Sequence, residues 1–156
     1  MNLSPHFTLA ELTRSETAQR YQIDNTPDVA GIAKLRKVCE TILEPVRRQF
    51  GVTIINSGYR SPAVNKRVPG SSNTSQHTFC EAVDFEVPGF SNYEVALWCT
   101  KNLGSWGQVI LEFYTPGSPS SGWVHASLPR SGKANNQVLT AIRANGRTRY
   151  VTGLQA

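Results

Sequence analysis

The chain has 156 residues, of which 39% are hydrophobic and 17% are charged, and its formal net charge is +5. This composition predicts a folded globular chain with a sizeable core and argues against a disordered one. No apolar run approaches the ~18 residues of a membrane-spanning helix, so we expect one domain over residues 1–156 and no membrane insertion.

Helical signals dominate the first third of the chain. Thr8 and Glu11 have the spacing of a capping box, which predicts a short helix close to the N-terminus. Asp28 is placed to cap a longer helix whose apolar stripe covers residues 32–50. Pro45 lies inside that stripe, so it should kink or end the helix.

Strand signals dominate the rest of the chain. The predicted strands are 52–56, 82–87, 108–114, 122–128, 137–143 and 147–152. Two helices are also predicted in this part, one that begins at Ser61-Pro62 and one that covers 92–103. Ser91 and Glu94 form a second capping box, and Asn145-Gly146 is a hairpin signal between the last two strands. Because helices cluster early and strands late, we predict an α+β fold with helices packed on an antiparallel sheet.

A histidine and an aspartate lie close together at the end of the stretch SGYRSPAVNKRVPGSSNTSQHTFCEAVD, which covers residues 57–84. His77 closes a polar loop, and Asp84 follows seven residues later on the polar face of strand 82–87. An imidazole and a carboxylate that converge in a cleft can supply two of the three protein ligands of a catalytic zinc ion. The only later histidine is His125, in an alternating strand, and it is the candidate third ligand.

These motifs resemble a known family. SGYRSP, SQH, the spacing from His77 to Asp84, and WVH at 123–125 are similar to those of zinc peptidases of bacterial cell-wall peptides. That family contains the D-alanyl-D-alanine carboxypeptidases and related phage endolysins, and it shares its fold with the hedgehog signalling domain. FTLAELTRSETA and LEPVR also resemble its small single-domain members, so the resemblance covers roughly residues 5–128. It implies a hedgehog-like fold, a zinc ion held by His77, Asp84 and His125, and a monomer that hydrolyses peptidoglycan peptides.

The resemblance also implies the catalytic groups. Glu112 precedes the strand of His125 and takes the place of the general base, while Glu81 and Glu86 are alternative bases. Arg60 of SGYR is the implied partner of the scissile carbonyl oxygen or of a terminal carboxylate. If the strands of Glu112 and His125 pair as a hairpin, their register decides whether the two side chains lie on the same face. They do so only if the numbers of two directly opposed residues add up to an odd number.

Four more residues are expected to contact the substrate. Ser75 and Gln76 could hydrogen-bond the peptide backbone, and Tyr59 and Trp123 could wall the cleft. For all four, a role in packing is the alternative. His6 matches no ligand position, so we expect it to be structural.

Two positions depart from patterns of the family. Gly122 occupies the place where another arrangement in the family has a Glu, three residues before the last His. Cys80 stands three residues after the first His, where the family usually has Gly. Cys80 could alter the backbone beside the metal or compete as a soft ligand, and a buried, inert thiol is the alternative we favour.

The positive charge gathers towards the C-terminus. No Asp or Glu follows Glu112, whereas five basic residues do: Arg130, Lys133, Arg143, Arg147 and Arg149. Nucleic acid, a bacterial wall rich in carboxylates and anionic polymers, or no partner at all are the three interpretations of such a surface. No nucleic-acid motif accompanies the charge, so we expect no nucleic-acid partner.

The cysteines and the first residues bear on localisation. MNLSPHFTLAEL lacks the charged start and apolar centre of a signal peptide. Cys39, Cys80 and Cys99 form an odd set, which favours free thiols in a reducing compartment. We therefore expect synthesis in the cytoplasm and action on the cell wall after release.

The sequence thus predicts a zinc-dependent peptidase that hydrolyses peptidoglycan stem peptides, as a D-Ala-D-Ala carboxypeptidase or as an endopeptidase, and a phage endolysin is one such enzyme. The alternative is a non-catalytic, zinc-stabilised module that binds cell walls or belongs to a virion. Glu112 argues against this alternative, because a structural zinc needs no base and prefers four closed ligands.

Overall fold

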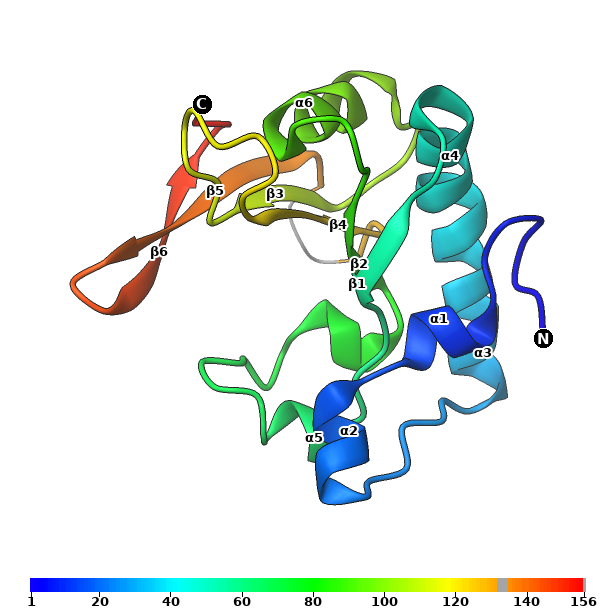
Figure 1. Cartoon of the computed structure of the whole chain (residues 1–156). Helices are drawn as coiled ribbons and strands as arrows, with labels where there is room; N and C mark the ends of the chain where they lie inside the picture. The colour runs from blue at the N-terminus through cyan, green and yellow to red at the C-terminus, as the bar shows by residue number, and fades with distance from the viewer. Residues whose placement is uncertain (132–134, 156) are drawn as a thin grey trace.

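The computed structural model describes residues 1–131 and 135–155. Within them, six strands form one sheet in the order β1-β2-β4-β3-β5-β6 (Figure 1). The strands are β1 Ile54–Ser57, β2 Ala82–Glu86, β3 Gln108–Glu112, β4 Trp123–Ser127, β5 Gln137–Ala144 and β6 Arg147–Thr152. With the helices described below, this confirms the predicted α+β class.

The sheet is antiparallel except at one pair of strands. Four neighbouring pairs run antiparallel, and β3 and β5 run parallel. The reason is topological. Because β2 already occupies the outer edge of β4, the chain that leaves β4 returns on the free edge of β3, in the same direction as β3.

The helices lie mostly before the sheet in the chain. They are α1 Leu9–Thr13, α2 Glu16–Tyr21, α3 Val29–Val38, the π turn η1 Cys39–Leu43, α4 Glu44–Phe50, α5 Pro62–Asn65, the 3₁₀ turn η2 Gln76–Phe79, and α6 Asn92–Asn102. The capping box of Thr8 and Glu11 is present, and Asp28 caps α3 as predicted. Ser91 accepts a hydrogen bond from the Glu94 N–H at the start of α6.

Pro45 does not end the long helical segment, which continues to Phe50. In a regular helix the proline ring clashes with the carbonyl four residues before it. Here the π turn η1 directly precedes α4, and the Glu44 N–H donates to the carbonyl of Cys39, five residues back. This wider turn gives the ring room and carries the chain past the proline.

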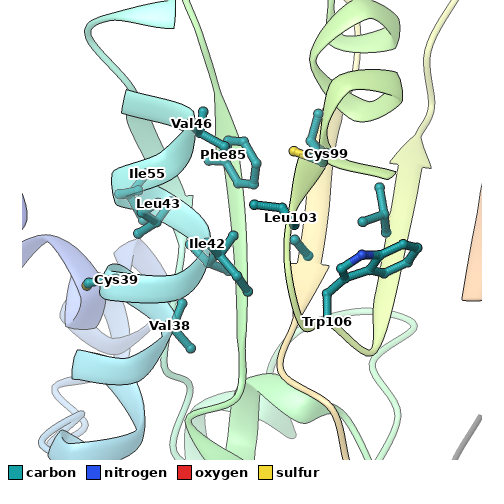
Figure 2. Close-up of a cluster of buried hydrophobic side chains, with 14 of the residues drawn as sticks. Val38, Cys39, Ile42, Leu43, Val46, Ile55, Phe85, Cys99, Leu103 and Trp106 are labelled. Carbon is teal, nitrogen blue, oxygen red and sulfur yellow. The ribbon is translucent and has the colours of Figure 1, made fainter. Parts of the chain in front are cut away.

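One face of the sheet forms the core. The register places on it Val83, Phe85, Val109, Leu111, Val124 and Ala126, all of them buried. Val38, Ile42 and Val46 of the segment α3–η1–α4 cover this face together with Cys99, Leu103 and Trp106 in and after α6 (Figure 2). Burying one such side chain contributes about 1.5–3 kcal/mol. The opposite face carries Asp84, Glu112, Trp123 and His125, so the packed core leaves it available for a site.

The expectations of free cysteine thiols and of no membrane-spanning helix can be compared with this fold. Cys39, Cys80 and Cys99 are all buried and none forms a disulfide. In the two described stretches, every helix is too short or too polar to cross a bilayer.

A buried carboxylate fastens the N-terminal segment to α4. Glu44 is only 5% exposed, and its Oε1 accepts hydrogen bonds from the Ser4 hydroxyl and the His6 backbone N–H. The His6 ring also contacts its Oε2 at 2.8 Å, which confirms the structural role expected for His6. Burial opposes ionisation of Glu44, but the hydrogen bonds from Ser4 and His6 outweigh it and hold its pKa below the ordinary value.

We expect Glu44→Gln to destabilise the protein by about 2 kcal/mol at neutral pH, because buried donors lose their charged acceptor. The folded pKa is depressed, so the stabilisation is complete above the unfolded value of about 4.3 and is lost as pH falls through the folded value. Denaturant unfolding should therefore show a difference between the two proteins that is constant above about pH 5 and shrinks below it. Glu40→Gln, at an exposed position one turn earlier, is the control and should change little. A difference that does not depend on pH would contradict this account.

Candidate metal centre

Three side chains from three elements converge on the open face of the sheet. His77 of η2, Asp84 of β2 and His125 of β4 offer ligand atoms that all lie within 4.8 Å of one another. Asp84 Oδ1 is 3.3 Å from His77 Nε2 and 2.9 Å from His125 Nδ1. Both histidines are buried, at 3% and 7% exposure. The structure therefore brings together the three residues that the sequence proposed as ligands.

Strand pairing explains how Asp84 meets His125. The two residues are direct partners in the antiparallel pair β2–β4, so their side chains rise from the same face. Ile110 of β3 opposes His125 on its other side and is also buried. The pairing thus fixes two ligands on rigid neighbouring strands and needs no loop to position them.

His77 is oriented by a short turn and by a backbone carbonyl. Ser75 caps η2, because its hydroxyl accepts the His77 backbone N–H. The Nδ1 of His77 lies 2.7 Å from the carbonyl oxygen of Gly58, which can only accept, so Nδ1 carries the proton. Nε2 is therefore left with a lone pair directed towards Asp84. A hydrogen bond of this kind sets the tautomer of a metal-binding histidine.

Gly58 has to be a glycine here. A Cβ at this position would lie 2.3 Å from the backbone oxygen of Leu12 in α1. The next residue, Tyr59, donates its N–H to that same oxygen at 2.7 Å. The SGYR motif thus presses against α1, and this contact holds the Gly58 carbonyl in place for His77.

The donor set fits a zinc ion. Two imidazole nitrogens and one carboxylate oxygen are a usual set for catalytic zinc. Burial alone would raise the pKa of Asp84, but the neighbouring His77 and the hydrogen bond from His125 hold it well below its ordinary range. Asp84 is therefore a carboxylate at neutral pH, as a ligand must be.

Glu112 stands beside this cluster at the end of β3. Its partner in β4 is Trp123, so opposed residue numbers sum to 235, and the odd sum needed for Glu112 and His125 to share a face is confirmed. Glu112 Oε1 lies 3.9 Å from His125 Nδ1. Burial and the negative charge of Asp84 raise the pKa of Glu112 to about 7, although His125 and Arg60 act in the opposite direction.

Gly122 explains why a glutamate three residues before His125 is absent. Gly122 has φ +67°, and a Cβ there would lie 2.0 Å from the backbone oxygen of Glu112. No side chain fits at this point of the β3–β4 connection. In this chain a carboxylate can reach the cluster from Glu112 but not from position 122.

Arg60 approaches the cluster from the loop after β1. Its Nη2 donates to the Ser75 hydroxyl at 3.3 Å, and its buried Nε has no hydrogen-bond partner among the described residues. Burial lowers the pKa of Arg60, while Asp84 and Glu112 act to raise it. The guanidinium is thus close to the site carboxylates and retains a donor for a further oxygen atom.

The four residues expected to contact substrate have different surroundings. Ser75 caps η2 and contacts Arg60, and the Gln76 amide donates to the carbonyl of Leu128. Tyr59 lines a pocket of about 440 Å³ between η2 and the start of α3. Trp123 rises on the face of Glu112, and its buried Nε1 lacks a hydrogen-bond partner in the described part of the chain. Contact with a peptide stays a prediction for all four.

The alternative bases are engaged elsewhere. Glu81 accepts hydrogen bonds from Arg130 and also lies 3.7 Å from the ammonium group of Lys34. Glu86 accepts hydrogen bonds from Asn56 and Asn92. These partners favour Glu112 over both residues as the base.

Cys80 ends η2 in a left-handed conformation, with φ 60°. This backbone explains why glycine suits the position. The side chain faces α3, since a Cβ added to Gly31 would lie 2.8 Å from the sulfur. Burial raises the pKa of the thiol to about 11. Cys80 does not belong to the ligand cluster found among the described residues, and its protonated thiol fits the inert role.

We expect Cys80→Gly to leave bound metal unchanged, because the thiol faces α3 and the three ligands stay in place. Metal analysis of the purified variant beside the parent protein checks this. A fall in metal content for Cys80→Gly would show that the thiol contributes to the site after all.

The basic residues that follow Glu112 are divided among different surroundings. Arg130 hydrogen-bonds Glu81 and lies over the ring of Phe79. Arg143 lies over Phe113 at the edge of the site face. Arg147 and Arg149 are exposed on β6, and Lys133 lies outside the described residues. Among the described residues, Arg147 and Arg149 thus lie on the face of the β5–β6 hairpin opposite to Arg143, and Arg130 is paired with Glu81.

Two imidazoles and a carboxylate on one sheet face, with a second carboxylate beside them, are typical of proteins that hydrolyse bonds with a metal ion. A family model described as Peptidase M15 matches residues 5–114, which is more than half of the chain. The chain therefore belongs to the peptidase M15 family, and it is a hydrolase of a metal-dependent kind. The matched part contains Arg60, His77, Asp84 and Glu112, while His125 lies beyond it. A search of curated proteins found no match.

Proposed function

We propose that this protein is a zinc peptidase that hydrolyses the stem peptides of peptidoglycan. The observation that carries the proposal is the meeting of His77, Asp84 and His125 with a carboxylate of Glu112 only 3.9 Å from the nearest ligand nitrogen. Membership of the peptidase M15 family supplies the peptide as substrate class. The sequence resemblance to cell-wall peptidases supports the choice of wall peptides.

His77 through Nε2, His125 through Nδ1 and Asp84 through a carboxylate oxygen would hold the ion. When bound, zinc supplies a Lewis acid for the scissile carbonyl and lowers the pKa of a water molecule that it binds. Three protein ligands leave the open position that a catalytic site needs, whereas a structural site usually closes all four.

Glu112 and Arg60 supply the chain's own chemistry. Glu112 takes a proton from the attacking water and can return it to the leaving amine, as a general base and then a general acid. Arg60 directs N–H donors at the oxygen that becomes negative during attack, or at the terminal carboxylate of the substrate. Burial of both side chains strengthens these electrostatic effects, because little water screens them.

The bond that is cut can be one of two. A D-Ala-D-Ala carboxypeptidase would use Arg60 to bind the terminal carboxylate, and an endopeptidase would use it at the scissile carbonyl. A phage endolysin that reaches the wall after release from the cytoplasm is one setting for either reaction. The chain is proposed to act as a monomer with a single domain.

A non-catalytic wall-binding or virion module is the second candidate. It accounts for the three ligands but leaves Glu112 without a role. A buried carboxylate that is not needed costs stability, so its position beside the cluster favours the enzyme.

Mass spectrometry of purified peptidoglycan treated with the protein tests the proposal. We expect shortened stem peptides, whose masses show whether terminal D-Ala or an internal bond is lost, and we expect no such products with a chelator. Zinc-loaded protein that binds the wall material but releases nothing would favour the module.

A further inference from the structure

The β5–β6 hairpin lies outside the matched family region, yet it adjoins the site. β5 runs beside β3, with Ala141 opposite Glu112, and Tyr150 of β6 lies opposite Ala141. Opposed residues rise from the same face of a sheet. Tyr150 therefore stands in one row with Glu112, two strands away, which is about 10 Å at the usual strand spacing. The hairpin extends the site face beyond the catalytic strands and projects from the body of the protein (Figure 1).

In this row the middle residue, Ala141, has a much smaller side chain than Glu112 and Tyr150 on either side of it. Ala141 is buried and has only a methyl group. Tyr150 is 54% exposed, so its ring stands above this methyl group and can contact a ligand. Burial, then the negative charges of Glu112 and Asp84, raises the pKa of the Tyr150 phenol. The hydroxyl therefore stays a hydrogen-bond donor and lies within the electrostatic influence of the site.

Arg143 lies on the same face of β5, two residues after Ala141. Its guanidinium carbon is 4.7 Å from the centre of the Phe113 ring, and that ring packs on Trp123 with centroids 5.4 Å apart. Among the described residues, no carboxylate lies within ion-pair distance of Arg143. A guanidinium stacked on an aromatic ring keeps its N–H edge for a planar anion.

The backbone is shaped to build this stack. Phe113 has φ 56°, which is uncommon for a bulky residue and costs energy. Its N–H donates to the Ala141 carbonyl at 2.9 Å, so β5 itself holds the strained residue. The conformation places the ring between Arg143 and Trp123, directly after Glu112 in the chain.

We propose that Arg143 and Tyr150 form a subsite for a carboxylate-bearing residue of the peptide substrate. This deepens the proposed function and rests on it. The guanidinium of Arg143 binds the carboxylate and the Tyr150 hydroxyl donates a further hydrogen bond. Arg60 follows β1, at the sheet edge opposite to β5 and β6, and its guanidinium reaches the cluster from that side. The bound peptide therefore has one arginine on each side of Glu112.

A matched set of peptides tests the subsite. The probes are the synthetic stem peptide L-Ala-γ-D-Glu-L-Lys-D-Ala-D-Ala and versions in which each carboxylate in turn is replaced by its amide. With the zinc-loaded protein, amidation at one position should lower kcat/KM by roughly tenfold or more, as expected for loss of a charged hydrogen bond. Arg143→Gln should abolish that preference by slowing only the acidic peptide. Tyr150→Phe should have a smaller effect in the same direction.

Arg149→Gln is the matched control, because Arg149 pairs with Ile142 and faces the other side of the same hairpin. It should keep the preference, and its melting temperature shows whether the hairpin tolerates such changes. Equal loss on acidic and amidated peptides in Arg143→Gln would overturn the proposal, as would an unchanged preference.

The subsite and the proposed function can fail separately. Cleavage of every peptide without any preference for a carboxylate would sink the subsite and leave the peptidase standing. If no peptide is cleaved, calorimetric binding of the same set to the zinc-loaded protein decides the subsite alone. A preference for the acidic peptide that Arg143→Gln removes supports it, and equal binding of all the peptides contradicts it.

Discussion

Glu112→Gln is expected to slow hydrolysis of a wall peptide by about 10²–10⁴-fold, the usual contribution of a general base. Gln keeps the size of the side chain but is no longer a base for the proton of water. His77, Asp84 and His125 are unchanged, so metal content should stay the same. The melting temperature should not fall much, because Gln fills the same space and removes a charge whose burial is unfavourable.

Glu86→Gln is the control for this substitution. Glu86 is a carboxylate of similar exposure on β2 of the same sheet, and it accepts hydrogen bonds from two asparagines rather than facing the cluster. Its replacement should leave turnover within a few-fold of the parent. Normal turnover in Glu112→Gln would place the base elsewhere, and a parallel loss of metal would make Glu112 a ligand or its support.

Gly122→Ala is expected to remove both activity and a large part of the stability. The added Cβ would lie 2.0 Å from the Glu112 oxygen and 2.8 Å from the carbonyl carbon of Phe113. Backbone atoms cannot move aside as a flexible side chain can, so the end of the β3–β4 hairpin has to rearrange. We expect a loss of more than ~3 kcal/mol in unfolding free energy, in the range of severe mutations. Glu112 lies at the point of rearrangement, so activity should fall with it.

Gly117→Ala separates this clash from simple backbone strain. Gly117 lies in the same connection with φ +84°, but nothing stands within 4 Å of its added Cβ. It should therefore lose only the ~1 kcal/mol expected for a left-handed residue and remain active. Denaturant unfolding of the two variants gives the comparison. Equal effects would mean that the close approach at Gly122 is unimportant.

The metal cluster was predictable because its residues carry local signals. His77 and Asp84 are close in sequence, and alternation in strand 82–87 set the face of Asp84. The meeting with His125 depends on the pairing of β2 with β4, which are separated in the chain by α6 and β3. Alternation does not reveal which strands pair, so the third ligand is predicted from His125 being the only later histidine, and the family resemblance implies the same residue.

Other features depend on contacts that leave no local pattern. The parallel pairing of β5 with β3 follows from which sheet edge is free after β4 has paired with β2. The turn η2 has only four residues, with no apolar period, and it is recognisable from the Ser75 cap and the left-handed Cys80. Gly58 and Gly122 must lack a side chain because a Cβ at either position would clash with the backbone oxygen of a residue elsewhere in the chain. The residue types are visible in the sequence, and their neighbours appear only after folding.

Metal analysis combined with a hydrolysis assay tests the central claim most directly. Protein purified without chelator should contain one zinc ion per chain, and His77→Ala should contain almost none. Stripping the metal should abolish cleavage of a wall peptide, and added zinc should restore it. Full hydrolysis by metal-free protein, or an unmutated chain that binds no zinc, would contradict the account.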